Sequence, residues 1–294
     1  MKILITGSAG RVGRAIYIKL MQLHHVIGVD ITPCSTVDIV ADIRDLARIR
    51  HALINIDVVI HCAALHAPHV NIASDEDFNS INIMATEQLV LEGIKQGLRH
   101  FIFTSTTALY GFASTQENQA SWIDETITPQ PKSIYHTSKI AAEKKLAQLS
   151  HLFNLPVTVL RMSRCFPETA DLMSIYRSTR GIDVRDVAQA HACAVELRLP
   201  GFKTYIISGS TPFTPKDCVM LYTDAGTLIH EKMPDLATEF RRRQWSMPCS
   251  LDRVYDSALA QTELQWQPMH GYQSVLTMLD NELPEVLPVI NLSK

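Results

Sequence analysis

Residues 2–13 read Lys2-Ile3-Leu4-Ile5-Thr6-Gly7-Ser8-Ala9-Gly10-Arg11-Val12-Gly13. A short apolar run that leads into glycines spaced three residues apart is typical of a buried strand that turns directly into a helix. Glycines at such a turn let the backbone approach a phosphate closely, and the start of the helix offers free N–H groups and a positive dipole end. The stretch therefore predicts a strand, a phosphate-binding loop and a helix, which together open a parallel α/β fold.

Strand-like and helix-like segments alternate over the following residues. The expected strands are 2–6, 26–30, 57–62, 100–105 and 157–161, and the expected helices are 12–23, 43–53, 78–95 and 133–152. Nearly all-apolar strands separated by helices indicate parallel strands whose two faces are both covered. Because such crossovers are right-handed, we predict a doubly wound parallel sheet of the Rossmann type.

This alternation weakens after Arg161. A helix at 183–197 and a strand at 203–208 are still expected, whereas the chain from 211 onward reads as Pro-punctuated helices with an irregular stretch at 244–253. We therefore predict a dinucleotide-binding domain of residues 1–161, with 182–210 returning to its sheet. Residues 162–181 and 211–294 should form a smaller C-terminal α/β lobe that binds the substrate.

Composition and charge narrow the classes of partner. The 294 residues carry a net charge of −3, which gives no electrostatic case for nucleic acid or a membrane surface. Six widely spaced cysteines without a Cys-x-x-Cys pair suggest reduced thiols, and no apolar segment has the length of a membrane span. We expect a cytoplasmic protein. His66-x-x-His69 has no third ligand at zinc spacing, so no metal is expected.

The acidic residue that ends the second strand bears on the choice of dinucleotide. Asp30 can accept hydrogen bonds from the adenosine ribose and would repel an additional phosphate there. No Arg or Lys follows it at once, so we expect NAD rather than NADP. Asp42 and Ile43 could flank the adenine, although Asp42 could equally be a helix N-cap.

Tyr135 and Lys139 are four residues apart in an expected helix, and such residues lie on one face. An ammonium group beside a phenol favours the phenolate and would bring the pKa of Tyr135 down from its usual value near 10. The pair therefore predicts a general acid/base. Alone it is weak evidence, because many surface helices carry such a pair.

Several segments in chain order resemble the extended short-chain dehydrogenase/reductase family, which includes NAD-dependent sugar epimerases and dehydratases. They are the glycine loop, Cys62-Ala63-Ala64, Asn82 within 82–86, the segment 103–111, Tyr135 with Lys139, Leu160-Arg161, 181–188, and 264–268, in which Gln265 stands where the family has Gly. The resemblance implies NAD as cofactor, a sugar or nucleotide-sugar substrate, and a homodimer.

The resemblance also implies roles for individual residues. Tyr135 would be the general acid/base, Lys139 would lower its pKa and hold the nicotinamide ribose, and Thr106 would hydrogen-bond the reacting substrate oxygen. The cofactor-binding residues would be Gly7, Ala9, Gly10, Arg11, Val12, Gly13, Asp30, Asp42, Ile43, Cys62, Ala63, Ala64, Asn82, Ser105, Tyr135, Lys139, Arg161 and Cys165.

The segment after Arg161 departs from the epimerase pattern. Met162-Ser163-Arg164-Cys165-Phe166-Pro167 lacks the family's Asn and Gly, and few residues separate it from Asp186. This is more similar to the uronate dehydrogenase branch, which holds a sugar carboxylate with an arginine of this segment. Arg164, Arg177 or Arg180 could pair with a carboxylate or phosphate. Thr107 is a further expected substrate contact.

Three functions stay open from the sequence. The first is epimerisation or dehydration of a sugar or nucleotide sugar, with hydride returned to the same molecule. The second is net oxidation by a sugar or uronate dehydrogenase that releases NADH, and the third is a non-catalytic nucleotide-sensing protein. A homodimer is expected through the helices that begin near Phe78 and Ser133, with Ile81, Met84, Leu89, Ile140, Ala141 and Leu146 as candidate contacts or, alternatively, as core residues.

Overall fold

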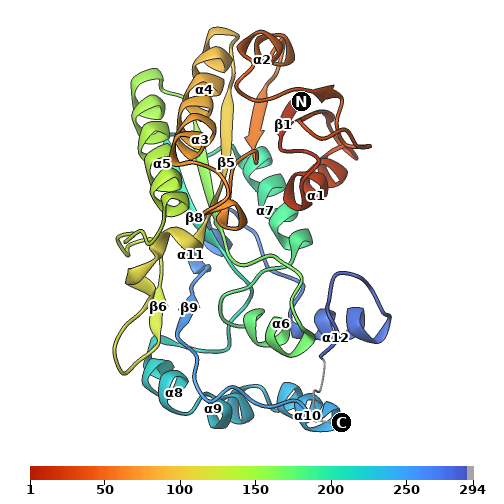
Figure 1. Ribbon diagram of the computed structural model, residues 1–294, viewed down its shortest axis with the longest axis vertical. Coiled ribbons are helices and arrows are strands. Elements are labelled where there is room, and N and C mark those ends of the chain that lie inside the picture. The colour runs from red at the N-terminus through yellow and green to blue at the C-terminus, as the bar shows by residue number, and fades with distance from the viewer. Residues whose placement is uncertain (290–294) are drawn as a thin grey trace.

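A seven-stranded parallel sheet forms the centre of the computed structural model, which describes residues 1–289 (Figure 1). Its strands run in the order β3-β2-β1-β4-β5-β7-β8. They are β1 (Lys2–Thr6), β2 (His25–Asp30), β3 (Ile39–Val40), β4 (Val58–His61), β5 (His100–Thr106), β7 (Val157–Met162) and β8 (Phe202–Ile207). The doubly wound Rossmann-type sheet is confirmed, including the late return of the chain as β8.

The strand order reverses at β1, which pairs with β2 on one side and with β4 on the other. The loops that follow β1 and β4 therefore leave the sheet side by side at its carboxyl edge. In open α/β sheets a crevice forms at this position, because the adjacent crossovers turn away to opposite faces.

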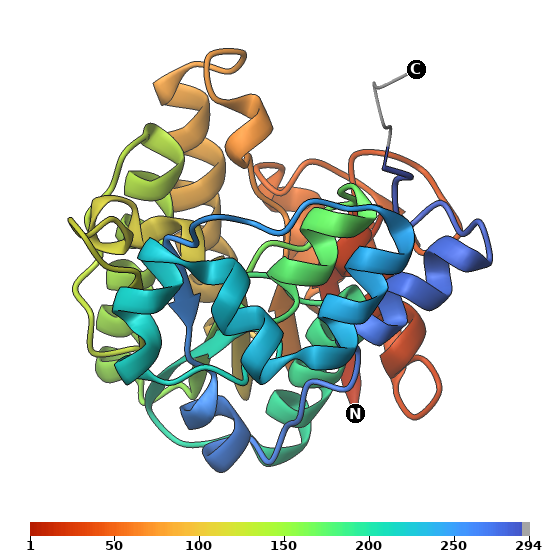
Figure 2. The ribbon, with the colours of Figure 1, turned by 90° about the horizontal axis from the view of Figure 1, so that it is seen from below.

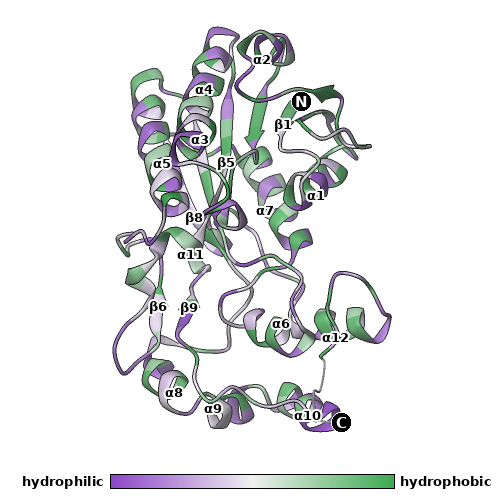
Figure 3. Ribbon diagram, in the orientation of Figure 1, coloured by the Kyte–Doolittle hydropathy of each residue, from purple (hydrophilic) through white to green (hydrophobic). Residues whose placement is uncertain are grey.

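Helices cover both faces of the sheet. Along β1, Ile3 and Ile5 pack into the apolar cluster that contains α1 and α7, while Leu4 packs into the cluster on the opposite face. Figure 3 shows mainly hydrophobic strands between helices that alternate in hydropathy. The first face carries α1 (Arg11–Leu20), α7 (Val184–Leu197) and α11 (Ala258–Glu263), and the second carries α2 (Leu46–Ala52), α4 (Ala85–Lys95) and α5 (Ile134–Phe153).

A smaller lobe lies beyond the carboxyl edge of the sheet (Figures 1 and 2). It holds a two-stranded parallel sheet, in which β6 pairs with β9. Its elements are β6 (Ser121–Ile123), α6 (Ala170–Tyr176), α8 (Cys218–Thr223), α9 (Ala225–Lys232), α10 (Pro234–Arg243), β9 (Arg253–Tyr255) and α12 (Tyr272–Asp280). Ala120 packs in the lobe's apolar cluster, so the segment before β6 joins residues far along the chain.

The expected helix at 78–95 consists of three parts. They are α3 (Asp75–Phe78), a π-helical turn η2 (Asn79–Met84) and α4. Short 3₁₀ turns occur at Ala67–His69, Thr107–Tyr110, Phe112–Ser114 and Pro215–Asp217. The strands β3, β6 and β9 were not expected, because runs of two or three residues have no detectable periodicity.

Two of the candidate dimer contacts are core residues. Leu89 and Leu146 are buried in the cluster between the sheet and its helices, and Ile81 lines the pocket described below. Met84 is exposed and Ala141 is half-buried, so both are still available to an interface, whereas the half-buried Ile140 packs against the cluster that contains Tyr110. The dimer stays a prediction. Within residues 1–289, no helix combines the length and apolar character needed to cross a membrane.

Candidate active site

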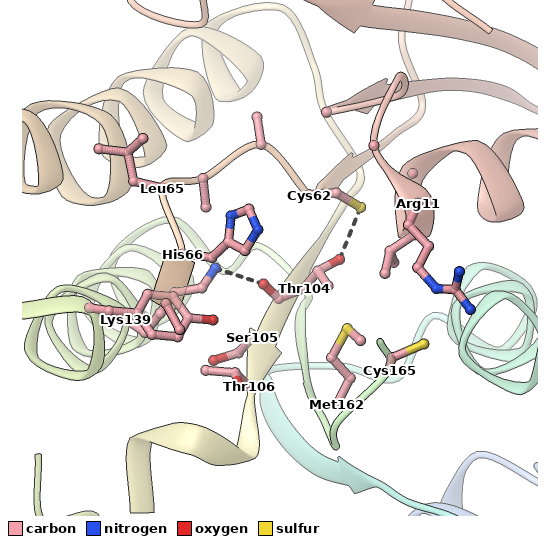
Figure 4. Close-up of a pocket in the computed structure, with 18 of the residues that line it drawn as sticks. Arg11, Cys62, Leu65, His66, Thr104, Ser105, Thr106, Lys139, Met162 and Cys165 are labelled. Carbon is pink, nitrogen blue, oxygen red and sulfur yellow. Dashed lines mark hydrogen bonds between the residues drawn. The ribbon is translucent and has the colours of Figure 1, made fainter. Parts of the chain in front are cut away.

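A pocket of about 610 Å³ lies along the carboxyl edge of the sheet, and part of its lining is drawn in Figure 4. We divide it into two halves. The glycine-loop half is lined by Gly7, Gly10, Arg11, Val12, Gly13, Asp30, Ile31, Ala41, Asp42, Ile43, Arg44, Cys62, Ala63 and Ala64. The lobe half is lined by Thr106, Thr107, Ala108, Ser163, Arg164, Phe166, Arg180, Arg253 and Tyr255. Tyr135 and Lys139 also line the pocket.

Close backbone packing shapes the glycine loop. Gly7 has a φ of +73°, and a Cβ there would lie 2.6 Å from the backbone nitrogen of Ala63. A Cβ on Gly13 would lie 2.1 Å from the carbonyl oxygen of Gly7. The loops after β1 and β4 therefore approach this closely because residue 7 is glycine, and the start of α1 packs on the glycine loop because residue 13 is glycine.

The start of α1 is arranged to meet an anion. Its N-cap is Gly10, which has no side-chain capping bond, and the first turn contains no acidic residue. Arg11 lines the pocket beside it, pairs with Glu285, and has a buried Nε without a partner among the described residues. Free N–H groups and an unsatisfied guanidinium nitrogen fit the pyrophosphate of a dinucleotide.

Two carboxylates lie at the outer end of the glycine-loop half. Asp30 accepts the N–H of Ala9 at 3.0 Å and that of Thr32 at 2.9 Å, which holds it beside the loop. Ala9 does not itself line the pocket, and its contribution is this hydrogen bond. Asp42 pairs with Arg44, whose hydrogen bonds lower the pKa of Asp42, and both line the pocket beside Ile43. Asp45, rather than Asp42, is the N-cap of α2.

A buried hydrogen-bond network holds the neighbouring loops together. Asn82 lies in the π-helical turn outside the pocket lining, where its side chain bonds both backbone groups of Leu65 and the hydroxyl of Ser138. Ser138 in turn donates to the carbonyl of Tyr135. Asn82 thus positions the loop after β4 against the helix that carries Tyr135, an indirect contribution in place of the expected cofactor contact.

Tyr135, Thr106 and Lys139 come together at the middle of the pocket. Tyr135 and Lys139 lie one turn apart on α5, and Thr106 ends β5. Lys139 is 4% exposed, and its Nζ donates to the carbonyl of Thr104 at 2.8 Å (Figure 4). The same Nζ lies 4.1 Å from the centre of the Phe103 ring.

The charges at this point differ from the prediction. Burial raises the pKa of Tyr135 to about 12, opposed only by the hydroxyl of Thr106, and burial lowers the pKa of Lys139 to about 8. The predicted lowering of the phenol's pKa by Lys139 is therefore wrong for this arrangement. The ammonium group donates to a backbone carbonyl, and desolvation of the phenol raises the pKa of Tyr135.

Two polar networks support the pocket wall from behind. Ser105 donates to Glu143 at 2.6 Å, and Glu143 pairs with Arg161. Arg161 does not line the pocket, where a cofactor contact was expected. It holds Glu143, and through it Ser105, behind the pocket wall. On the other side, Cys62 and Thr104 are hydrogen-bonded at 3.1 Å, and Thr104 bonds His191 at 2.8 Å.

The candidate substrate-binding residues separate into two groups. Thr107, Arg164 and Arg180 line the lobe half, whereas Arg177 is 2% exposed and pairs with Asp183 at 3.0 Å. The expectation that Arg177 contacts substrate is not met, because its guanidinium is enclosed by protein. Cys165 lines the pocket next to Arg11, and burial raises the pKa of its thiol to about 11.

Other lining residues were not expected as contacts from the sequence. Among them Arg44, Ser163, Arg253 and Tyr255 carry polar groups. Arg44 is two residues after Asp42, so its place in the pocket lining could have been inferred from the prediction for Asp42. Arg253 and Tyr255 depend on the three-residue strand β9, which left no sequence signal.

His66 lines the pocket, and it is held against His69 in a short turn. The backbone N–H of His66 donates to Nδ1 of His69, and the two rings are 4.4 Å apart in an edge-on arrangement. Within the described part of the chain, no group of three potential ligands surrounds a common point.

Comparison with known proteins agrees with this geometry. The sequence model of the NAD dependent epimerase/dehydratase family matches residues 3–173. The chain belongs to this family. A Bacillus subtilis protein described as an uncharacterized UDP-glucose epimerase is 28% identical over 183 residues, which is 55% of each chain. The dTDP-D-glucose 4,6-dehydratase of Mus musculus is 26% identical over 184 residues, 56% of this chain and 50% of that protein. The chain thus matches about half the length of these relatives.

Solved structures share the epimerase/dehydratase fold over nearly the whole chain. A short-chain dehydrogenase/reductase superfamily protein from Agrobacterium tumefaciens with bound NAD gives a TM-score of 0.73 at 17% identity, over 96% of both chains. UDP-glucose-4-epimerase from Stenotrophomonas maltophila, with NAD and formylated UDP-arabinopyranose, gives 0.70 at 20% identity, over 94% of this chain and 96% of that one. At these identities the likeness establishes the fold.

Two sequence segments that resemble this family meet in space beyond the matched residues. The buried carboxylate of Asp186 accepts the N–H groups of Met269 and His270, and the indole of Trp266 donates to the carbonyl of Asp186 at 3.0 Å. Segment 264–268 therefore fixes the start of α7 from outside the sheet. Gln265 adopts a φ of +50°, a left-handed conformation that suits the Gly expected from the resemblance.

Proposed function

We propose that this protein is an NAD-dependent enzyme that acts on a hydroxyl or carbonyl group of a sugar or nucleotide sugar. The observation that carries the proposal is the meeting of Tyr135, Thr106 and Lys139 in one pocket with the glycine loop. NAD, when bound, accepts and returns a hydride and in its oxidised form brings a positive charge beside the phenol. The chain's own residues bind the two molecules and move the proton.

The glycine-loop half binds the dinucleotide in this proposal. The N–H groups at the start of α1 and the guanidinium of Arg11 hold the pyrophosphate, while Asp30 accepts the ribose hydroxyl groups. The carboxylate of Asp30 excludes the extra phosphate of NADP, so NAD is the preferred cofactor.

Tyr135 is the group that exchanges a proton with the substrate oxygen, and Thr106 hydrogen-bonds the same oxygen. Because burial raises the pKa of Tyr135 to about 12, the phenol is protonated before the reactants bind. A positive charge beside it favours the phenolate and brings the pKa toward the working range. Lys139, anchored on Thr104, holds the nicotinamide ribose and adds to that charge.

The first candidate reaction returns the hydride to the same substrate, as in epimerisation. The family and the UDP-glucose epimerase relative favour this reaction. Dehydration also needs an acid that protonates the leaving hydroxyl group. The only carboxylic acids that line the described pocket are Asp30 and Asp42, both in the glycine-loop half. This distribution favours epimerisation over dehydration.

Net oxidation with release of NADH is the second candidate. The arginines of the lobe half favour it, because they suit a small sugar acid. The two versions are separated by absorbance at the NADH band. The full chain is mixed with NAD and with either UDP-glucose or D-glucuronate, and the sugar products are analysed in parallel.

Epimerised product without steady NADH supports the first version, and NADH equimolar with an oxidised product supports the second. Binding of NAD without conversion of either compound or of related free sugars would contradict an enzymatic role. Failure to bind NAD at all would contradict the proposal as a whole.

A further inference from the structure

Arg11 is the only charged residue of the glycine loop, residues 7–13. It lines the pocket, and its Nη2 forms an ion pair with Oε2 of Glu285. The two side chains are 27% and 44% exposed, so water reaches both partners. The cation expected to meet the pyrophosphate therefore already has a negative partner, which comes from a segment far along the chain.

Glu285 is carried by a short segment, residues 283–289, which we call the strap. The backbone N–H of Leu287 donates to the carbonyl of Glu168 at 2.9 Å, which pairs the strap with the segment before α6. Val286 is 5% exposed and packs into an apolar cluster with residues of α6 and α12. The strap is thus anchored by bonds and packing that do not involve the side chain of Glu285.

The strap contacts elements that form both halves of the pocket. Glu168, whose carbonyl accepts the strap, pairs through its carboxylate with Arg164, and Arg164 lines the lobe half. Glu285 reaches Arg11 at the start of α1, in the glycine-loop half. The carboxylate of Glu285 is therefore held beside the position where a dinucleotide has to enter.

The other surroundings of Arg11 add no negative charge. Cys165 lies beside the guanidinium group, and burial raises the pKa of its thiol to about 11, so the thiol is neutral (Figure 4). The first turn of α1 contains no acidic residue. Among residues 1–289, no second acidic side chain forms an ion pair with Arg11. Glu285 therefore sets the net charge at this point of the cofactor site.

A pyrophosphate and Glu285 make opposing demands on one guanidinium group. Two anions on the same guanidinium lie closer together than the Debye length, about 8 Å at physiological ionic strength, so salt does not screen their repulsion. Because Glu285 is partly exposed, its carboxylate can leave Arg11 for water. The apparent affinity for the dinucleotide is then reduced by the fraction of molecules in which Arg11 is paired.

We propose that Glu285 is an affinity-determining residue of the cofactor site, whose carboxylate occupies Arg11 in the free protein and competes with the pyrophosphate of NAD. The assignment rests on the proposed function, because it takes NAD to be the cofactor. It adds that the strap, a segment outside the Rossmann sheet, weakens the grip of the glycine loop on the dinucleotide. Release of the dinucleotide is correspondingly easier than the glycine loop alone would allow.

The test is isothermal titration of the full chain with NAD. Glu285→Gln should bind NAD about fivefold more tightly than the unaltered protein, the size expected when a partly exposed ion pair no longer has to be broken. Glu285→Ala is a second variant with the same expectation. Glu282→Gln removes the same charge from an exposed position just before the strap, so it is the matched control and should leave the affinity within twofold.

A double-mutant cycle shows whether the effect acts through Arg11. Arg11→Met should weaken NAD binding, because a cation that meets the pyrophosphate is lost. In the Arg11→Met background, Glu285→Gln should change the affinity less than twofold, since no guanidinium group is left to compete for. A merely general effect of charge would persist in that background.

NAD affinity of Glu285→Gln that is weaker than, or within twofold of, that of the unaltered protein would overturn the assignment. A weaker affinity would mean that Glu285 orients Arg11 instead of competing for it. Equal tightening in the Arg11→Met background or in Glu282→Gln would also overturn it.

The proposed function fails separately. It fails if neither the unaltered protein nor Glu285→Gln binds NAD, and the competition is then overturned with it. Binding by Glu285→Gln alone would support the competition in its strongest form. Binding by both proteins with equal affinity leaves the proposed function standing and overturns the competition.

Discussion

The glycine-loop half of the pocket is made mainly of backbone and small side chains from loops beside β1, whereas the lobe half is made of long charged side chains from distant segments. In the first, the close approach of Gly7 and Gly13 fixes the shape, and in the second the shared contact of Arg180 and Arg253 with Asp252 does so. The comparison teaches that a binding surface built from backbone tolerates almost no added atoms. A surface built from side chains can change its ligand by single substitutions.

The largest effect on cofactor binding should follow from adding one methyl group to the glycine loop. In Gly13→Ala the new Cβ would lie 2.1 Å from the carbonyl oxygen of Gly7, so the loop must move. We expect NAD affinity to fall about 100-fold or more, since a displacement of about 1 Å at a site can cost that much. Titration with NAD, followed by tryptophan fluorescence, measures the loss.

The control for this substitution is Gly226→Ala. Gly226 lies on α9, where the nearest atom to a new Cβ is 3.5 Å away, so NAD affinity should stay unchanged. NAD affinity within threefold of the unaltered protein in Gly13→Ala would show that the loop does not have the tight geometry described.

Acid should weaken the sheet that carries the glycine-loop half. Burial lowers the pKa of His61 to about 3, and those of His100 and His191 to about 4. Below pH 6.5 the unfolded chain binds protons that the folded protein does not, so the free energy of unfolding falls as the pH drops toward 4. The slope reaches about 1.4 kcal/mol per pH unit for each histidine.

Urea unfolding at pH 7 and pH 5 measures this effect. His191→Gln should be less stable at pH 7. Its free energy of unfolding should fall between pH 7 and pH 5 by about a third less than that of the unaltered protein. His230 is exposed on α9 in the lobe, and His230→Gln should leave the drop unchanged. An equal drop in His191→Gln and the unaltered protein would contradict the neutral state of that imidazole.

A smaller effect is expected at the outer end of the glycine-loop half. Asp30→Asn removes the charge that repels a second ribose phosphate, and Arg44 remains close by in the pocket. The preference for NAD over NADP should fall about tenfold, because one unfavourable charge contact is lost. Parallel titrations with NAD and NADP measure the ratio. An unchanged ratio would show that Asp30 does not face the adenosine ribose, and Asp38→Asn, at a residue outside the pocket lining, serves as the control.

The smallest effect should follow from a change outside both halves. Gln265 is exposed and has a φ of +50°, which costs a residue with a Cβ roughly 1 kcal/mol relative to glycine. Gln265→Gly should therefore raise the free energy of unfolding by up to about 1 kcal/mol without a change in NAD binding. A clear loss of stability would show that the Gln265 side chain makes a contact of its own, and Gln267→Gly is the matched exposed control.

The contrast between the halves also explains what the sequence could predict. The glycine-loop half depends on residues adjacent in the chain, so spacing alone located Gly7, Gly10, Gly13 and Asp30. Apolar periodicity likewise predicted the sheet. Arg253 reaches the pocket only because β9 pairs with β6 across more than a hundred residues, and three-residue strands carry no periodic signal.

Errors in the predicted site have a common cause. Arg177 and Arg180 lie three residues apart on one turn, yet the first is buried against Asp183 and the second faces the pocket. Spacing shows which residues are near a site but not which way each side chain points. The pKa of Tyr135 was predicted with the wrong sign for the same reason, because the depth of burial and the bond from Lys139 to Thr104 depend on the tertiary structure.

The central claim is that the phenol of Tyr135 exchanges a proton with the substrate in a pocket shared with NAD. The direct measurement is turnover of Tyr135→Phe with the substrate that the assays identify, alongside its affinity for NAD. We predict a loss of 10²–10⁴-fold in kcat, the usual contribution of a positioned acid/base, with NAD affinity nearly unchanged. Turnover within threefold of the unaltered protein would contradict the claim.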